Sequence, residues 1–531
     1  MAFSRVASCR AHFFRRKLIH LSPLARHIRT GFFPDDHDFI NPEDPLLSEP
    51  LNARWRNMDD PTLQNRVLER SNVGMGMLVI NRASLDLPCV NELYKRLRNL
   101  EVNSLKRFVG LAAMEPGPFS IGLDPKELLL AAVYAQKRGK LSRFSKALLW
   151  NSQELAYLVA DYRKPLVCHL GGVAQDAGAA LVCLASFSGA YEDSEICVRA
   201  CRHGLVPMGG MTYLLASLPW HLGEFLALTG WTLRGYELVA LDLVEHWLSP
   251  EALPFLELTS EKQLEVSEAD AKLLLHEHSL PLPQEGDLFQ ISNAEGEGFK
   301  RRYIPLINKI FRHKSPLLIR EALKLEQKSA QSASDYKFLE ECLEGMDQAS
   351  TKASWITLEL IDNARKRRND IKNKNDPKRP EADERRIREG CLPESLRKEL
   401  WAQQCLLQGK EDLPEIIQRL HAACTHQEMP RQNAGDVPLA QDIQEATNFP
   451  KDFVFAVPED RSEISLSQHP RLRRYHPDYD PVTGLDHDPD WMRQEAERWD
   501  PELFADERRE AVEELLGDRD PSAFGLSRWV R

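Results

Sequence analysis

The stretch from Lys164 to Leu248 constrains the fold more than any other part of the chain. It opens with Leu166–Phe187, the most apolar run in the sequence. It continues through Gly204-Leu-Val-Pro-Met-Gly-Gly-Met-Thr-Tyr213 to Leu226-Ala-Leu-Thr-Gly230. The apolar run is interrupted by a histidine, a glutamine and an aspartate, and no run reaches the roughly 18 apolar residues that a membrane span needs. We therefore expect no membrane-spanning segment.

The segment before this stretch predicts an α/β fold. Residues 75–82 and 108–113 are short apolar runs typical of buried strands, and residues 90–100 have apolar side chains at helical spacing. Strand–helix–strand order with short apolar strands is typical of α/β proteins. Residues 128–162 are expected to be helical, with an exposed basic face around 137–146.

Several motifs resemble the crotonase fold of the enoyl-CoA hydratase/isomerase superfamily, and within it 3-hydroxyisobutyryl-CoA hydrolase. They are Ile80-Asn-Arg82, Pro118–Leu128, Gln175–Leu181, Gly204–Tyr213 and Leu226–Gly230, and the resemblance covers roughly residues 75–325. It implies a crotonase-like ββα spiral core, a C-terminal helical region, and extended N- and C-terminal arms.

The resemblance also places the site residues. Enzymes of this family stabilise a thioester oxyanion with two backbone N–H groups, which fall on Leu123 and Ala177. The two family acids fall on Ala200 and Met208, neither of which can position water or accept its proton. Asp176 replaces the first glycine of a glycine-rich turn, where its charge would oppose an oxyanion; alternatively, it caps the following helix.

We therefore expect no catalytic residue, cofactor or metal. His203 lies near the missing acids and could serve as a base, although a structural role is the alternative. Ten cysteines show no CxxC pair and are expected to be buried thiols.

Composition along the chain suggests six regions. Residues 1–34 are arginine-rich and free of acids, as in a mitochondrial presequence, with a disordered basic arm as the alternative. Next come an irregular N-terminal arm (35–70), the crotonase-like core (71–260), a C-terminal helical region (261–350), a charged linker with helices (351–425), and a C-terminal extension (426–531). Helices are expected at 393–408, 413–424, 489–498 and 501–516.

A basic and acidic run at 365–390 has few hydrophobic residues and predicts a solvated linker. The alternative is a peripheral ribosomal RNA contact through Arg365, Lys366, Arg367 and Arg368. The net charge of −11 argues against a dedicated nucleic-acid binder.

Two functions remain open. The first is a silenced hydrolase-like protein, resembling the hydrolase-like subunit of the mitochondrial small ribosomal subunit. It would act in the mitochondrial matrix and bind ribosomal proteins through its arms, whose C-terminal aromatics suggest anchors, although they could instead dock on the chain's own core. The second is an active mitochondrial 3-hydroxyisobutyryl-CoA hydrolase of valine breakdown, and only this function requires a CoA thioester.

Overall fold

A computed structural model describes most of the predicted core and helical region. The described residues are 66–71, 74–103, 105–114, 117–249, 275–281, 303–374, 380–431, 440–448 and 512. The predicted presequence, most of the N-terminal arm and the aromatic part of the C-terminal extension lie outside them, as do the helices expected at 489–498 and, except for residue 512, at 501–516.

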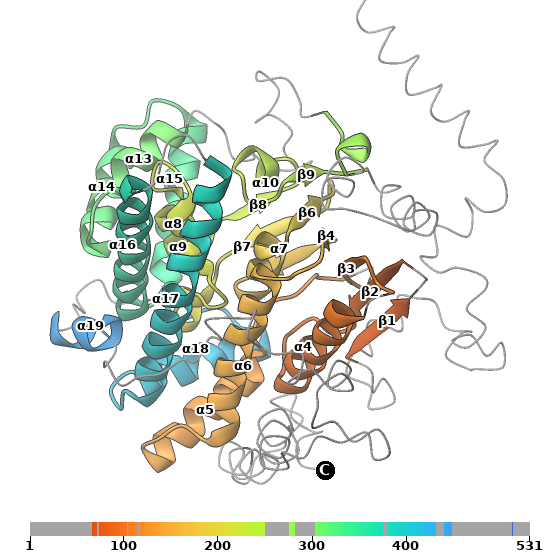
Figure 1. Ribbon diagram of the computed structural model, residues 1–531. Helices are drawn as coiled ribbons and strands as arrows, with labels where there is room; N and C mark the ends of the chain where they lie inside the picture. Colours follow the sequence, from red (N-terminus) through yellow and green to blue (C-terminus); the bar gives the residue numbers. More distant parts are fainter. Residues whose placement is uncertain are drawn as a thin grey trace, which may run out of the picture.

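A six-stranded sheet forms one side of the molecule (Figure 1), with strand order β1-β2-β3-β4-β6-β9. Its strands are β1 Val67–Ser71, β2 Met75–Ile80, β3 Phe108–Ala113, β4 Leu166–Leu170, β6 Phe187–Ala190 and β9 His246–Trp247. All neighbours are parallel except β1, which pairs antiparallel with β2. Residues 67–70 were expected to be irregular; they form a strand because they find a partner in β2.

A second, three-stranded sheet lies over the turn that follows β4. It contains β5 Val173–Gln175, β7 Glu195–Cys197 and β8 Thr232–Arg234. The strands β2, β3 and β4 are almost entirely buried, as expected for parallel strands covered on both faces. The predicted strands at 75–82 and 108–113 are confirmed.

The helices described in the core are α4 Leu87–Val102, α5 Pro125–Arg138, α6 Arg143–Ala160, α7 Ala177–Leu184, the 3₁₀ helix η2 Ala200–His203, α8 Met211–Ser217, α9 Leu222–Thr229 and α10 Glu237–Ala240. Three of them, α4, α5 and α6, begin at a residue whose side chain caps them. Asp124 caps α5 and Ser142 caps α6 through side-chain hydrogen bonds to backbone N–H groups, which satisfies donors that the helix leaves unpaired.

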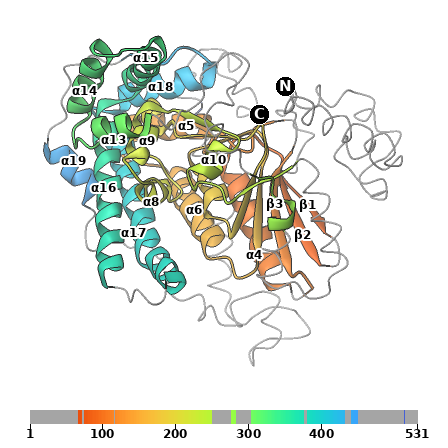
Figure 2. The same ribbon diagram turned by 90° about the horizontal axis from the view of Figure 1, so that it is seen from above.

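The C-terminal helices form a layer on the side away from the sheet (Figure 2). They are α13 Ile304–Phe311, α14 Pro316–Lys328, α15 Ala333–Gln348, α16 Thr351–Lys374, α17 Pro380–Gln408, α18 Leu413–Thr425 and α19 Ala440–Thr447. The prediction of a linker at 365–390 is wrong, because α16 and α17 cover all of it except residues 375–379. The helix expected to begin at Pro393 begins at Pro380, with Pro393 inside it.

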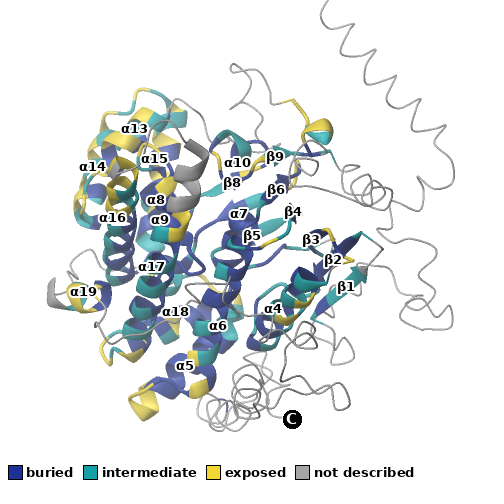
Figure 3. Cartoon of the chain, in the orientation of Figure 1, coloured by how far each residue is buried: buried dark blue, intermediate teal, exposed yellow. Residues whose placement is uncertain are grey.

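One hydrophobic core joins the two regions. Buried side chains of α16 and α17 belong to the same cluster as those of α7 and α8. The charged residues of 365–374 and 380–390 therefore lie on helices whose neighbouring apolar residues, such as Ile361 and Leu396, are buried in this core. Figure 3 colours these buried residues dark blue, with exposed residues in yellow on α13, α14 and α15.

The described residues contain neither a candidate membrane span nor a candidate metal site. Within that part of the chain, no helix combines the length and apolarity needed to cross a bilayer. The same residues contain no cluster of three or more histidine, cysteine or acidic side chains placed to hold a metal ion.

Candidate functional site

The two predicted backbone donors lie beside each other. Leu85 donates its N–H to the Gly122 oxygen (2.8 Å) and accepts from the Asp124 N–H (3.2 Å), so the Leu123 N–H between them points the other way. A Cβ added at Gly122 would lie 3.6 Å from the Ala177 nitrogen. No acceptor for the Leu123 or Ala177 N–H lies within the described part of the chain. The segment that carries Leu123 therefore lies against the start of α7, and the two N–H groups have no acceptor among the described residues.

Asp176 holds the turn that presents Ala177. Its φ of 46° is a value that side-chain-bearing residues rarely adopt and glycine adopts freely. It stands at the N-cap position of α7, but its side chain does not cap that helix, so the capping prediction is wrong. Instead, the carboxylate accepts from the N–H groups of Arg199 (2.9 Å) and Ala200 (3.1 Å).

Desolvation raises the pKa of the Asp176 carboxyl to about 6, even though hydrogen bonds from Gln175, Ala200 and Arg199 lower it. At neutral pH the group is therefore mainly ionised. A negative charge one residue from the Ala177 N–H opposes the charge that two such donors stabilise. The sequence identified this charge but not its partners.

Ala200 and the loop that carries Met208 lie close to Asp176 and Ala177. Ala200 donates its N–H to Asp176, and a Cβ added at Gly209, next to Met208, would lie 3.3 Å from the Ala177 Cα. Both side chains are buried. The structure thus brings together all four residues that the resemblance singled out. A methyl group and a thioether cannot take a proton from water.

His203 is a poor replacement base. It ends the 3₁₀ helix that starts at Ala200. Burial, together with the charges of Arg199, Arg202 and Arg419, lowers its pKa to about 4. An imidazole with that pKa is neutral at pH 7 but accepts a proton only weakly.

Glu399, on α17, is a buried carboxylate that sequence reasoning missed. Its oxygens accept from the Gly210 N–H (2.8 Å), the Thr212 N–H (2.8 Å), the Thr212 hydroxyl (2.7 Å) and the Gln153 amide (3.2 Å). It therefore satisfies the N-terminus of α8. Burial raises its pKa to about 7, against the effect of these donors.

Two glutamines complete this arrangement. Gln153 accepts from the Gly209 N–H (2.8 Å) and Gln403 from the Val206 N–H (3.1 Å). The loop that carries Met208 is therefore held by side chains of α6 and α17. The one sequence signal was a glutamate among apolar residues at helical spacing, Leu396 and Leu400 among them.

The basic run Arg365–Arg368 lies on α16 and is partly engaged within the molecule. Arg365 forms a bidentate ion pair with Glu224 of α9. Burial raises the pKa of Glu224, but the hydrogen bonds and charges of Arg365 and His221 outweigh this effect and lower the pKa to about 2. Lys366 pairs with Asp362 (2.6 Å). The side chains of Lys366 and Arg367 remain more than half exposed, at 59% and 51%.

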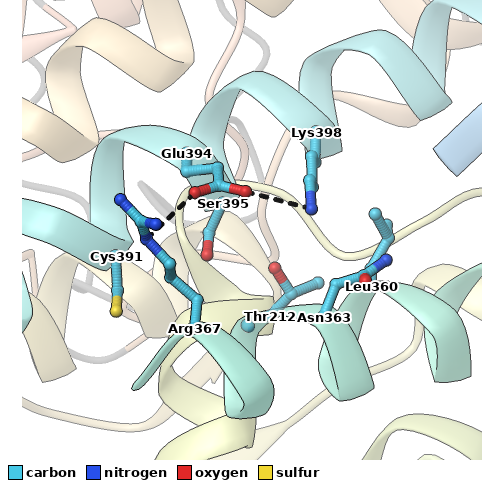
Figure 4. A pocket seen from close by; sticks show the side chains of 9 residues that line it. Thr212, Leu360, Asn363, Arg367, Cys391, Glu394, Ser395 and Lys398 are labelled. Carbon is cyan, nitrogen blue, oxygen red and sulfur yellow. Dashed lines mark ion pairs between the residues drawn. The ribbon is translucent and has the colours of Figure 1, made fainter. Parts of the chain in front are cut away.

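A small pocket lies between α16 and α17 (Figure 4). Arg367 (3.3 Å) and Lys398 (3.1 Å) both pair with Glu394 at its mouth. Thr212, Asn363, Ser395 and Cys391 also line it. The opposite charges neutralise one another there, so the pocket offers little excess charge to a ligand.

Comparison with known proteins identifies the class. The model of the enoyl-CoA hydratase/isomerase family matches residues 76–375, more than half of the chain. The chain belongs to this family, as its motifs predicted. A carnitinyl-CoA dehydratase from Mycobacterium thermoresistibile has the same fold, with a TM-score of 0.58, 17% identity, and coverage of 74% of this chain and 99% of that one.

Particular relatives fall into two groups. Small ribosomal subunit protein mS47 of Arabidopsis thaliana is 27% identical over 309 residues, which cover 57% of this chain and 70% of that protein. The mS47 protein of Schizosaccharomyces pombe is 25% identical over 36% of this chain and 44% of its own length. The mitochondrial 3-hydroxyisobutyryl-CoA hydrolase-like protein 1 of Arabidopsis is 31% identical over 32% of this chain and 40% of its own length.

Proposed function

We propose that this chain is a catalytically silent member of the family that serves as a structural subunit of the mitochondrial small ribosomal subunit. One observation carries the proposal. The N–H groups of Leu123 and Ala177 have no acceptor among the described residues, while both acid positions hold buried apolar residues and the Asp176 carboxylate accepts from the Ala200 N–H. A general acid or base contributes typically 10²–10⁴-fold to a rate, so losing both removes most of the chemistry.

The relatives support the ribosomal part of the proposal. Two proteins similar to this chain carry the name of a small ribosomal subunit protein, and the alignment with the Arabidopsis one covers 70% of its length. A third similar protein is named mitochondrial. The acid-free basic composition of residues 1–34 supports import into the mitochondrial matrix. Ribosomal proteins would be bound through the N- and C-terminal arms.

Co-sedimentation tests the assembly. Mitochondrial extract from cells that express the tagged full chain is fractionated on a sucrose gradient, and the chain is expected in the small-subunit peak. Dissociation of the subunit should return it to the top of the gradient. Finding the chain at the top of the gradient when subunits are intact would refute the ribosomal role.

The Leu123 and Ala177 N–H groups favour a second function, thioester hydrolysis with a relocated base. Purified chain is assayed with 3-hydroxyisobutyryl-CoA, and no turnover above background is expected. Turnover in the ordinary enzyme range, about 1–10³ s⁻¹, would overturn the silent reading. The double variant Ala200→Glu/Met208→Asp, with and without Asp176→Gly, restores the family acids, and a gain of activity would show that only these groups were missing.

A further inference from the structure

Helix α14 presents large apolar side chains to solvent. Six such side chains are exposed among the described residues, and two of them, Leu318 (50% exposed) and Leu325 (66%), belong to α14. Within the described part of the chain, α14 is the one helix that carries two. The helix is anchored to the core through another face, where Pro316, Ile319 and Leu323 are buried. The exposed leucines are therefore not needed for the packing that holds α14 in place.

The two leucines belong to a continuous row on the outside of the molecule. Views at right angles both place α14 at the edge of the helical layer (Figures 1 and 2), and exposed residues lie along it (Figure 3). Residues at alternating spacings of three and four follow one line along a helix, the pattern of two packed helices. The residues of this line, here called the α14 seam, are Ser315, Leu318, Ala322, Leu325 and Ser329.

Large and small side chains alternate along the α14 seam. Ala322 separates the two leucines, and a serine stands at each end. When a second copy of α14 lies along the seam in the opposite direction, each Leu325 can fill the space over Ala322 of the other copy. Each Leu318 then lies over Ser329. Because packed helices interdigitate large side chains with small ones, the seam is complementary to itself in shape.

The charges beside the α14 seam are complementary in the same arrangement. Glu321 and Lys328 lie on one flank of the seam, and neither forms an ion pair in the described part of the chain. With Leu325 level with Ala322 of the other copy, Glu321 is level with position 326 there. It is then two residues, or about 3 Å along the axis, from Lys328 of that copy. Two ion pairs can therefore form. A parallel pair would place Glu321 opposite Glu321, where like charges repel.

The other charges around α14 give its surface no dominant sign. Lys324, further round the helix, and Arg312, before its start, are exposed cations. Helix α15, which packs against α14, carries the exposed acids Glu340 and Glu344. Nucleic acid and anionic membranes need an excess of positive charge, so this balance favours a protein surface. The remaining charges near the seam form the ion pairs Lys309–Glu326, Lys314–Asp362 and Arg320–Asp347.

We propose that the α14 seam is a self-association surface, through which two copies of this chain form an antiparallel dimer with two-fold symmetry. Such a contact is isologous, because each copy uses the same surface. The seam spans about 21 Å of one helix, which is less than a standard interface requires, so the dimer is weak and depends on concentration. The inference concerns the free chain and does not rest on the proposed function.

Sedimentation velocity of the purified full-length chain tests the dimer. The sedimentation coefficient should rise from the monomer value toward the dimer value between about 1 µM and about 100 µM. Leu318→Gln/Leu325→Gln should stay monomeric over this range. It should keep the wild-type melting temperature at low concentration, because both leucines are exposed in the monomer. Leu105→Gln is the matched control, since it removes a leucine that is 70% exposed outside α14, and it should associate like the wild type.

Charge reversal tests the antiparallel arrangement. Glu321→Lys or Lys328→Glu alone sets like charges opposite each other and should weaken association about tenfold at low salt. The double variant Glu321→Lys/Lys328→Glu exchanges the two partners and should recover most of the wild-type affinity. The two residues lie about two turns apart on one helix, so this recovery requires a second copy. Added salt should reduce these differences.

A wild-type chain that remains monomeric at about 100 µM would overturn the inference. So would a leucine variant that associates as strongly as the wild type. A double charge variant as weak as the single reversals would contradict the antiparallel contact. A monomeric wild type whose leucine variant leaves the small-subunit peak would assign the seam to a ribosomal protein and would also overturn the dimer.

Discussion

Two carboxylates accept hydrogen bonds around the positions that the resemblance assigns to the family acids. Asp176 accepts from the N–H groups of Arg199 and Ala200. Glu399 accepts four hydrogen bonds, three of them from the loop that follows Met208. Both groups accept from backbone or side-chain donors that would otherwise lack a partner. A buried donor left without a partner costs about 1–3 kcal/mol. Acidic groups thus remain near the old site as structural acceptors.

Glu399→Gln tests this structural role. The amide nitrogen of glutamine would face N–H donors, so we expect a loss of about 1–3 kcal/mol in unfolding free energy at pH 5. The folded-state pKa of about 7 lies above the ordinary 4.5, so the folded chain binds this proton more tightly than the unfolded chain. The stability that this tighter binding contributes is complete below pH 4.5 and is lost as the pH rises to about 7, a change on the order of 3 kcal/mol.

Urea unfolding at pH 5 and pH 7.5 measures both effects. The variant should lack this part of the pH dependence, so its deficit against wild type should shrink as the pH rises. Glu340→Gln, at an exposed position of α15, is the control and should leave the wild-type curve unchanged. Identical pH slopes in Glu399→Gln and wild type would contradict the assignment.

At the scale of elements, the helical layer is docked through close backbone approach as well as through polar side chains. A Cβ added at Gly345 of α15 would lie 2.2 Å from the Thr229 oxygen at the end of α9. Backbone atoms cannot yield as a flexible side chain can. The spacing of α15 and α9 therefore depends on this glycine, and through α9 so does the position of the Glu224 carboxylate that holds Arg365.

Gly345→Ala should lower the unfolding free energy by about 1–3 kcal/mol, because the methyl group forces the two helices apart. Gly139→Ala is the matched comparison. Gly139 ends α5 with a φ of 68°, and a Cβ added there would meet no other atom. The alanine should therefore lower the unfolding free energy only through its left-handed backbone conformation, by about 1–2 kcal/mol. Chemical denaturation compares the two. Adding Arg365→Gln should change the unfolding free energy by different amounts in the two variants. The reason is that only Gly345 contacts α9, which carries Glu224, the partner of Arg365.

For the whole molecule, the family match ends at residue 375, but the core does not. Glu399, Gln403 and Gln153 hold the loop 206–212, and two of these three come from beyond that boundary. The buried side chain of Arg419 on α18 donates to the backbone oxygens of Arg202 (3.1 Å) and Gln348 (2.5 Å). The later helices are therefore part of the fold and do not form a separate appendage.

A chain truncated after residue 375 should not fold cooperatively. It would leave the N–H groups of Val206, Gly210 and Thr212 without their acceptors and expose the apolar surface that α17 and α18 cover. Soluble yield and the sharpness of thermal unfolding by circular dichroism measure this outcome. The full-length variant Glu399→Ala/Gln403→Ala removes the acceptors but keeps the apolar surface covered. It should be soluble but less stable than the wild type. A truncated chain that unfolds as sharply as the full chain would contradict a shared core.

The sequence by itself determined the family and the α/β fold, and it predicts Leu123, Ala177, Ala200 and Met208 as the site positions. Strand runs, glycine turns and caps act over a few residues, and ungapped motifs carry the site positions with them. Only the tertiary structure decided what α16 and α17 do and which groups Asp176 and Glu399 hold. Charged residues at 365–390 suggested a linker because only isolated apolar side chains, such as Ile371 and Ile387, interrupt that run, and the packing of Ile387 in the core is not visible in the sequence. The Thr212 and Glu399 contacts join residues 187 positions apart, and such partners are set by packing, which no local pattern encodes.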